Sequence, residues 1–191
     1  NGKDLTGWDG DPRLWRVENG VIIGETDKAD RKVGKNTFLI WNGGEPGDFD
    51  LSYKARVTGN NSGVQYRSRK IGDEGWSIGG YQMDLHPKQE YLGMLYEEQG
   101  RGIQCLRGQK VELPEAGGKA KETGKLEVEK VDLAEWNEFR IVAKGKVVQH
   151  YVNGKLAAEI TDLHPEKRSL KGLLALQLHA AQGLIGIVHL L

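Results

Sequence analysis

The stretch FRIVAKGKVVQHYVNGKLAAEI, residues 139–160, decides the fold class. Apolar and polar residues alternate through most of it, which is the pattern of a β-strand with one buried face. Two turn signals interrupt the alternation, Lys144-Gly145-Lys146 and Asn153-Gly154. An Asn-Gly pair suits the two positive φ angles of a type I′ turn. The segment therefore predicts three strands in an antiparallel meander.

The same pattern recurs along the chain. WRVENGVIIGE, residues 15–25, predicts a second hairpin with Asn19-Gly20 at its tip. Further strands are predicted at residues 37–41, 49–57, 63–69, 81–86 and 92–97. Turns that recur at intervals of about 8 to 12 residues are typical of a sandwich or a barrel. We therefore expect an all-β protein.

Two segments resist a simple assignment. LKGLLALQLHAAQG, residues 170–183, is rich in Leu and Ala, which favour helix. Its leucines nevertheless alternate with other residues from 174 to 178, so we favour a strand. EAGGKAKETGKLEVEK, residues 115–130, is charged and punctuated by glycine. It predicts a long solvated loop that enters a strand near Leu126.

Composition limits the classes of function. The 191 residues are enough for one core, so one domain spanning residues 1–191 is expected. Because 27 basic residues balance 27 acidic ones, no net field attracts nucleic acid or an anionic membrane. No apolar run is long enough to span a membrane. The single cysteine, Cys105, excludes an internal disulfide and is expected to be a small buried hydrophobe.

The stretch GGYQMDLHP, residues 79–87, raises the question of function. As a strand it places Tyr81 and Met83 on one face, and Gln82, Asp84 and His86 on the other. An amide, a carboxylate and an imidazole on one face form either an ordinary wet surface or part of a site.

Five stretches, taken together, resemble one bacterial family. They are NGKDLTGW at the start, DFDLSYKARV followed by NSGVQYRS, GGYQMD, EWNEFRIVAKG followed by HYVNGK, and the late GLLALQLHA. In this order they resemble the DUF1080 family, also called the 3-keto-disaccharide hydrolase domain, over nearly the whole chain. The ending GLIGIVHLL departs from the family, which usually has Phe, Arg and Asn there.

The resemblance implies a fold and an activity. The fold is a concanavalin A-like jelly-roll sandwich of two antiparallel sheets, one of them curved around the ligand. The activity proposed for the family is cleavage of glycosides whose sugar ring carries a ketone at C3. Family members are mostly exported, to the periplasm, the medium or the cell surface. The chain begins without Met, so any signal segment is expected to have been removed.

In such a sandwich, the alternating polar side chains of three strands are expected to lie on one face of a sheet. Val64, Tyr66, Leu176 and Leu178 are expected inside, together with Tyr81, Met83 and Leu85. The outward set is then Gln65, Arg67, Gln82, Asp84, His86, Gln177 and His179. Amides, imidazoles and arginine are groups that bind sugar hydroxyls, whereas wet strand faces usually carry Lys, Glu and Thr. We therefore predict that this polar face is part of a carbohydrate site.

Several further residues complete the predicted site. Tyr96 is expected to bind substrate, and Glu97 is preferred over Glu98 as the carboxylate at the groove. The alternative for Glu97 is a surface pair with Arg101. Trp41, with Trp76, is predicted at the groove rim, whereas Trp8, Trp15 and Trp136 are assigned to the core. His150 fits either side of its strand.

The chemistry implied by the family needs a base, an electrophile and an acid. A ketone at C3 makes the C2 proton acidic, so a base can remove it and the C1 glycosidic oxygen can leave before water adds. Asp84 or His179 is the predicted base, and Arg67 or a metal faces the enolate. His86 or Glu97 protonates the leaving oxygen.

Three alternatives stay open. The first is direct hydrolysis by two carboxylates, for which Asp84 and Glu97 are the candidates. The second is a lectin-like module that binds carbohydrate without cleaving it. The third is a metal held by Asp84, His86 and His179. We predict no cofactor, although Asp-rich loops such as Asp9-Gly10-Asp11 would allow calcium. Oligomeric state is left open.

Overall fold

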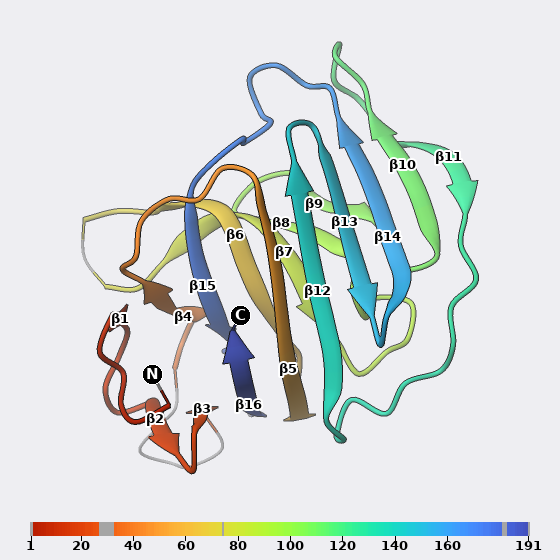
Figure 1. Ribbon diagram of the computed structural model, residues 1–191. Coiled ribbons are helices and arrows are strands. Elements are labelled where there is room, and N and C mark those ends of the chain that lie inside the picture. The colour runs from red at the N-terminus through yellow and green to blue at the C-terminus, as the bar shows by residue number, and fades with distance from the viewer. Residues whose placement is uncertain (1, 27–32, 74, 181–182, 191) are drawn as a thin grey trace.

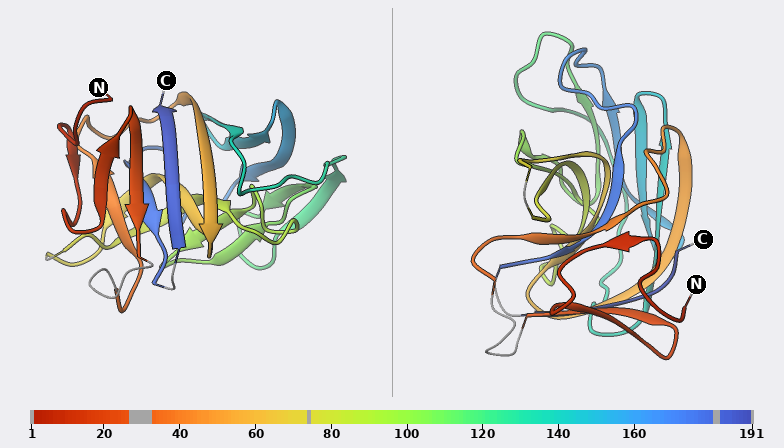
Figure 2. Two further views of the ribbon diagram at one scale, coloured as in Figure 1. Left: turned by 90° about the horizontal axis from the view of Figure 1, so that it is seen from below. Right: turned by 90° about the vertical axis from the view of Figure 1, so that its left-hand side faces the viewer.

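The computed structural model shows two β-sheets packed face to face (Figure 1). It describes residues 2–26, 33–73, 75–180 and 183–190, and for β16 (Gly183–Leu190) only the backbone and Ile185. The two further views show the sheets as two layers with long connections at their ends (Figure 2). Within the described residues there is no helix that is long and apolar enough to cross a membrane. The predicted all-β sandwich is confirmed.

The first sheet has seven strands and carries the pocket described below. In order across the sheet these are β1 (Trp8–Asp9), β4 (Thr37–Trp41), β15 (Leu173–Leu178), β6 (Ser62–Lys70), β7 (Ile78–Leu85), β8 (Leu95–Glu98) and β9 (Gly102–Cys105). All of its pairs are antiparallel. The Leu- and Ala-rich segment is thus the strand β15, as predicted, because its leucines pack into the core.

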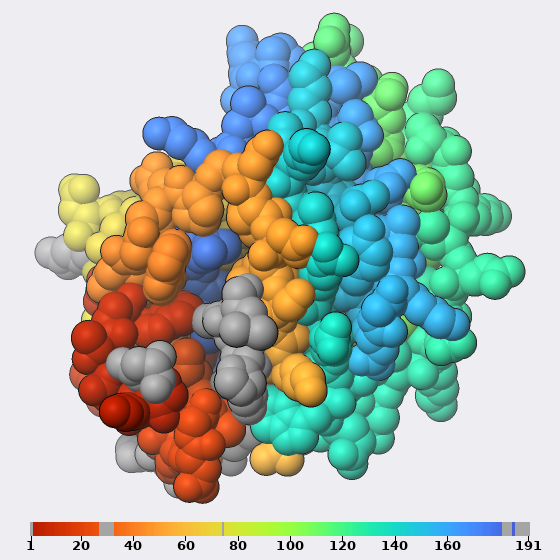
Figure 3. Space-filling model, in the orientation of Figure 1, coloured from red at the N-terminus to blue at the C-terminus, as the bar shows by residue number. Residues whose placement is uncertain are grey.

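The second sheet has nine strands. In order they are β11 (Lys121–Lys125), β10 (Gln109–Leu113), β14 (Lys155–Asp162), β13 (Val147–Val152), β12 (Asn137–Lys144), β5 (Phe49–Gly59), β16, β3 (Val21–Glu25) and β2 (Trp15–Glu18). Its outer surface, from β5 in orange to β14 in blue, faces the viewer in Figure 3. One pair departs from the predicted antiparallel pattern, since β10 runs parallel to β14.

The predicted meander and hairpins are confirmed. Strands β12, β13 and β14 pair antiparallel in sequence. Asn153 and Gly154 have φ angles of 49° and 77°, the left-handed values that an Asn-Gly turn requires. Asn19 and Gly20, at the tip of the β2–β3 hairpin, have φ angles of 51° and 79°.

The core lies between the sheets and draws side chains from both. Tyr53 of β5 stacks on Phe139 of β12 at 5.5 Å between ring centroids. Tyr66 of β6 lies 5.7 Å from Tyr81 of β7. The predicted inward residues of β6, β7 and β15 are all buried in this core, and so is Cys105.

Some sequence predictions were wrong in detail. Strand β8 begins at Leu95 rather than at residue 92, because Met94 N–H donates to Tyr91 O in a turn where Gly93 has a φ of 81°. Within residues 115–130 the strand is β11, which ends before Leu126. It lies at the sheet edge with its side chains mostly exposed, where charged residues are suitable.

The tryptophans divide differently from the prediction. Trp15 is buried and Trp8 packs against the core, as expected. Trp136 is 40% exposed, because its neighbour Asn137 takes the inward position at the start of β12. The Arg56 guanidinium lies 5.0 Å from the Trp136 ring.

His150 is the one polar side chain of β13 that is sealed between the sheets. Its Nδ1 lies 2.9 Å from Gly93 O, which can only accept, so the proton sits on Nδ1. Tyr66 Oη then donates to its Nε2 at 2.8 Å. Burial lowers the pKa of His150 to about 4. The imidazole is therefore neutral and fully paired.

We predict that His150 makes the fold sensitive to acid. The unfolded chain binds this proton near pH 6.5, so the stabilisation is present above that pH and is lost as pH falls toward 4. His150→Gln stays uncharged and should lose roughly 2 kcal/mol less stability than the parent protein between pH 7 and pH 4.5. Urea unfolding at both pH values measures this, with His164→Gln as the control. Equal losses in the parent and His150→Gln would contradict the assignment.

Candidate functional site

A cavity of about 260 Å³ opens on the outer face of the seven-stranded sheet. Its walls come from β7, β8, β9 and β15 and from residues just outside strand ends. The lining residues are Asn36, Asn61, Gln82, Asp84, His86, Tyr91, Met94, Tyr96, Glu98, Ile103, Gln177 and His179. Its volume is slightly below the common range for small-molecule sites, so it suits a ligand of about one sugar ring.

Strand parity places the polar groups at this cavity. On β7, Tyr81, Met83 and Leu85 enter the core, which directs Gln82 and Asp84 to the opposite face. Both are nevertheless only 1–2% exposed, because neighbouring side chains close over them. Gly63 is paired opposite Asp84, and a Cβ there would lie 2.5 Å from Gln82 Cδ. The glycine therefore provides the space for the Gln82 side chain.

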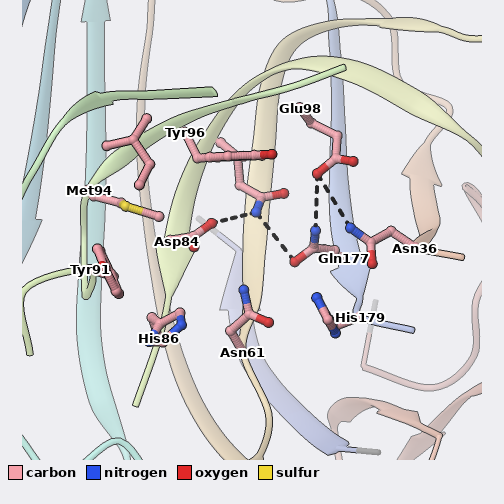
Figure 4. Close-up of a pocket in the computed structure, with 12 residues that line it drawn as sticks. Asn36, Asn61, Asp84, His86, Tyr91, Met94, Tyr96, Glu98, Gln177 and His179 are labelled. Carbon is pink, nitrogen blue, oxygen red and sulfur yellow. Dashed lines mark hydrogen bonds between the residues drawn. The ribbon is translucent and has the colours of Figure 1, made fainter. Parts of the chain in front are cut away.

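A row of hydrogen bonds joins two carboxyl groups across the cavity (Figure 4). Gln82 Nε2 donates to Asp84 Oδ1 and, at 3.3 Å, to Gln177 Oε1. Gln177 Nε2 donates to Glu98 Oε2 at 3.5 Å, and Asn36 Nδ2 donates to the same oxygen at 3.4 Å. Asp84 and Glu98 thus lie at opposite ends of two amides that come from different strands.

A second layer fixes the orientation of this row. Gln65 of β6, the cross-strand partner of Gln82, is fully buried, and its Nε2 donates to Gln82 Oε1 at 3.0 Å. Ser68 Oγ donates to Gln65 Oε1 at 2.6 Å. Since Gln82 Oε1 is occupied by a donor, its amide nitrogen must face Asp84 and Gln177.

Burial changes the acidity of both carboxyl groups. It raises the pKa of Asp84 to about 7, against the opposing effect of hydrogen bonds from Gln82 and Asn61; the charge of Glu98 adds to the increase. Burial also raises the pKa of Glu98, while hydrogen bonds from Asn36 and Gln99 lower it. Asp84 can therefore exchange a proton near neutral pH, as a general acid or base requires.

Two imidazoles lie on the same side of the amide row. Burial, followed by the charge of Lys88, lowers the pKa of His86, and burial lowers the pKa of His179. Both are therefore neutral at pH 7. His86 Nδ1 accepts from Lys88 N–H at 3.0 Å, so the neutral ring carries its proton on Nε2. His86 is thus a hydrogen-bond donor of fixed tautomer.

The structure brings together most of the sequence-predicted site residues. Gln82, Asp84, His86, Tyr96, Gln177 and His179 all line the cavity. Gln65 does not line the cavity, but it forms hydrogen bonds with Gln82 and Ser68. Glu97, Arg67 and Trp41 are not among the lining residues.

The preference for Glu97 over Glu98 does not agree with the geometry. Glu97 pairs with Arg101, which also binds Asp162 at 2.5 Å, and this matches the alternative considered for it. Of the two glutamates, Glu98 is the one that lines the cavity. Alternation along the strand that begins at Leu95 could not distinguish Glu97 from Glu98, because the sequence does not show which face of this short strand meets the core.

Arg67 and Trp41 lie elsewhere for different reasons. Arg67 has a φ of 48° in a bulge between Tyr66 and Arg69, which breaks the expected alternation. Its guanidinium instead donates to Gly145 O at 2.8 Å, in a turn of the other sheet. The Trp41 ring covers Gly43, where a Cβ would lie 1.9 Å from it.

Sequence reasoning missed six lining residues. Asn36, Asn61 and Glu98 contribute polar groups, and Tyr91, Met94 and Ile103 contribute apolar surface. Most of them lie at or beyond strand ends, where no periodicity signals orientation. Asn61, for example, directly precedes Ser62, the first residue of β6.

The described lining of the cavity offers an enolate no positive charge from Lys or Arg, and it forms no cluster of metal ligands. Of the described residues that line it, none is Lys or Arg. Nor do three or more His, Cys, Asp or Glu side chains gather as a metal site anywhere in the described ranges. Donors at this cavity are neutral: amides, a phenol and imidazoles.

Comparisons with known proteins agree with this picture. The family model of the "3-keto-alpha-glucoside-1,2-lyase-like domain" matches residues 1–186. No functionally curated protein matches the sequence.

Among solved structures, three illustrate the range of similar folds. A "putative glycosyl hydrolase" from Parabacteroides distasonis has a TM-score of 0.66 at 18% identity, covering 98% of this chain and 93% of that one. The carbohydrate-binding module CBM66 from Bacillus subtilis has a TM-score of 0.61 at 13% identity, covering 96% and 93%. A laminarinase from Rhodothermus marinus has a TM-score of 0.53 at 10% identity, covering 97% and 91%. At these identities the likeness establishes the concanavalin-like fold and no more.

We predict that Asp84 makes the fold less stable as pH rises. Because its pKa in the folded protein is about 7 and that of an unfolded Asp is about 3.9, the folded state holds this proton more tightly. That stabilisation is complete below pH 4 and is lost as pH rises through 7. Between pH 5 and pH 8.5 the free energy of unfolding of Asp84→Asn should therefore fall by roughly 3 kcal/mol less than that of the parent protein. Urea unfolding at the two pH values measures this decrease for each protein. Equal decreases in the parent and in Asp84→Asn would refute the raised pKa.

Proposed function

The chain belongs to the 3-keto-alpha-glucoside-1,2-lyase-like family, and from that premise we propose that it cleaves glycosides whose sugar ring carries a ketone at C3. The observation that carries the proposal is the pair Asp84 and Glu98 at the two ends of one amide row. Both carboxyl groups have raised pKa values, and both line one small cavity.

The proposed reaction begins with removal of the C2 proton. Asp84, as the carboxylate, takes this proton, and the electron pair of the C2–H bond forms an enolate with the C3 carbonyl. The His86 Nε2–H and the Asn61 amide donate hydrogen bonds to the C3 oxygen. A neutral imidazole of fixed tautomer is a suitable electrophile for an enolate, because it stabilises the charge without giving up its proton.

The second step breaks the glycosidic bond. The enolate electrons return to re-form the C3 carbonyl, a C1–C2 double bond forms, and the C1 oxygen departs. Glu98, whose pKa is raised by burial, is assigned to give that oxygen a proton. Water then adds across C1 and C2, so the net reaction is hydrolysis. His179 is assigned to bind the sugar beside this pair, with base catalysis as its alternative role.

A second candidate function is sugar binding without cleavage. The structural similarity to CBM66 favours it, since that protein is a binding module with the same fold. Paired amide donors and acceptors serve such a module as well as they serve an enzyme. Under either function, we propose that the protein is exported from the cell.

Incubation of a 3-keto-glucoside in D₂O separates these candidates. Proton abstraction predicts release of the aglycone together with deuterium at C2 of the keto-sugar, above the exchange seen without protein. Release with C2–H retained would show direct carboxylate hydrolysis instead. Saturable binding without release would show a binding module.

The assigned base is tested by Asp84→Asn, with His179→Ala beside it. Since general base catalysis contributes about 10²- to 10⁴-fold, kcat of Asp84→Asn should fall by that range. His179→Ala should mainly raise KM. Full activity in both variants would overturn the assignment of this cavity.

The two neighbouring glutamates provide a matched pair. Glu98→Gln should lower kcat at least 100-fold, because an amide cannot protonate the leaving oxygen. Glu97→Gln should keep kcat within about 3-fold and lower Tm, because it breaks the buried contact with Arg101. The reverse outcome, with kcat lost only in a folded Glu97→Gln protein, would restore Glu97 as the catalytic carboxylate.

A further inference from the structure

A second cavity of about 360 Å³ adjoins the first. Its described lining consists of Arg101, Ile103, Gln104, Leu113, Pro114, Gly117, Gly118, Lys119, Ala120, His164 and Lys167. Ile103 lines both cavities and is 49% exposed, so its side chain forms the wall between them. A ligand that fills the first cavity and extends past Ile103 would enter the second.

The two cavities differ in charge. The first contains two carboxyl groups, and its described lining has no Lys or Arg. The second contains Arg101, Lys119, Lys167 and His164, and its described lining has no Asp or Glu. A neutral ring and an anionic group are therefore suited to different ends of this combined site.

The available positive charge in the second cavity belongs to two lysines. Arg101 is neutralised by Glu97 and Asp162. Lys119 and Lys167 are exposed, and neither forms an ion pair with a described residue. Two acidic residues, Glu115 and Glu166, are close in sequence, but they do not line this cavity.

His164 adds a donor of fixed direction. Its Nδ1 accepts from the backbone N–H groups of Glu166 and Lys167 at 3.3 and 3.2 Å. The neutral ring therefore carries its proton on Nε2. The Gly117 position lies next to that nitrogen, since a Cβ there would be 3.5 Å from Nε2. Gly117 and Gly118 both have positive φ, so the loop curves where larger residues would be strained.

We infer that the second cavity is a subsite for an anionic group, a carboxylate, sulfate or phosphate, on the unit joined to the sugar in the first cavity. Lys119 and Lys167 supply charge, and His164 Nε2–H supplies a directed hydrogen bond. The preferred substrate is then a neutral 3-keto sugar linked to an acidic leaving unit. This inference rests on the proposed function for the identity of the first sugar.

The subsite is tested first without turnover. Methyl glucuronide and methyl glucoside, which carry no ketone, are titrated into the protein at low ionic strength, with chemical-shift changes as the readout. The expected result is at least 10-fold tighter binding of the glucuronide. The difference should disappear in the double variant Lys119→Glu/Lys167→Glu. It should survive in the control Lys54→Glu/Lys144→Glu, which makes the same charge change on exposed positions of β5 and β12. Equal binding of the two sugars, or selectivity unchanged by the first double variant, would overturn the inference.

Turnover then separates this inference from the proposed function. With 3-keto-glucosides of neutral and of carboxylate-bearing aglycones, kcat/KM should be at least 10-fold higher for the acidic one, and salt should reduce the difference. Cleavage of both at equal rates would leave the proposed function intact and contradict the subsite. Selective glucuronide binding without cleavage of either glycoside would support an anion subsite and contradict the enzyme.

Discussion

The amide row from Asp84 through Gln82 and Gln177 to Glu98 is the interaction on which the candidate site depends. It requires β15, β6, β7 and β8 to be neighbours in this order, with Gln65 opposite Gln82. A shift of one residue in the register of β7 would send Asp84 into the core and Met83 to the cavity. The function thus follows from strand pairing as much as from residue type.

This arrangement places ionisable groups where water is scarce. Asp84 is buried with one neighbouring carboxyl group and no described Lys or Arg in the cavity wall, which explains why its pKa rises instead of falling. His150, sealed on the core side, shows the opposite response, because burial disfavours its cationic form. One group therefore limits stability toward high pH and the other toward low pH.

Alternation in the sequence predicted the strands and much of the cavity for one physical reason, whereas the sandwich arrangement came from the family resemblance. The period of a strand is two, so alternating residues in GGYQMDLHP and LALQLHA assign their faces without further information. Prediction failed where a bulge interrupts the alternation, and where a strand is too short to show which of its faces is buried. The bulge at Arg67 turned its side chain to the other sheet, and β8 was too short to distinguish Glu97 from Glu98. Asn36 and Asn61 lie beyond strand ends, where only tertiary structure decides their direction.

The two adjoining cavities differ in charge. Ile103 separates a cavity with carboxyl groups from a cavity with lysines, so the site distinguishes the two ends of a ligand. The chemistry proposed for the first cavity requires Asp84 to exchange its proton near neutral pH. The most direct test is a ¹³C NMR titration of the Asp84 carboxyl carbon, with Asp84→Asn used to assign the signal. We expect an inflection near pH 7 that moves lower in Glu98→Gln. An inflection near pH 4, unchanged in that variant, would contradict it.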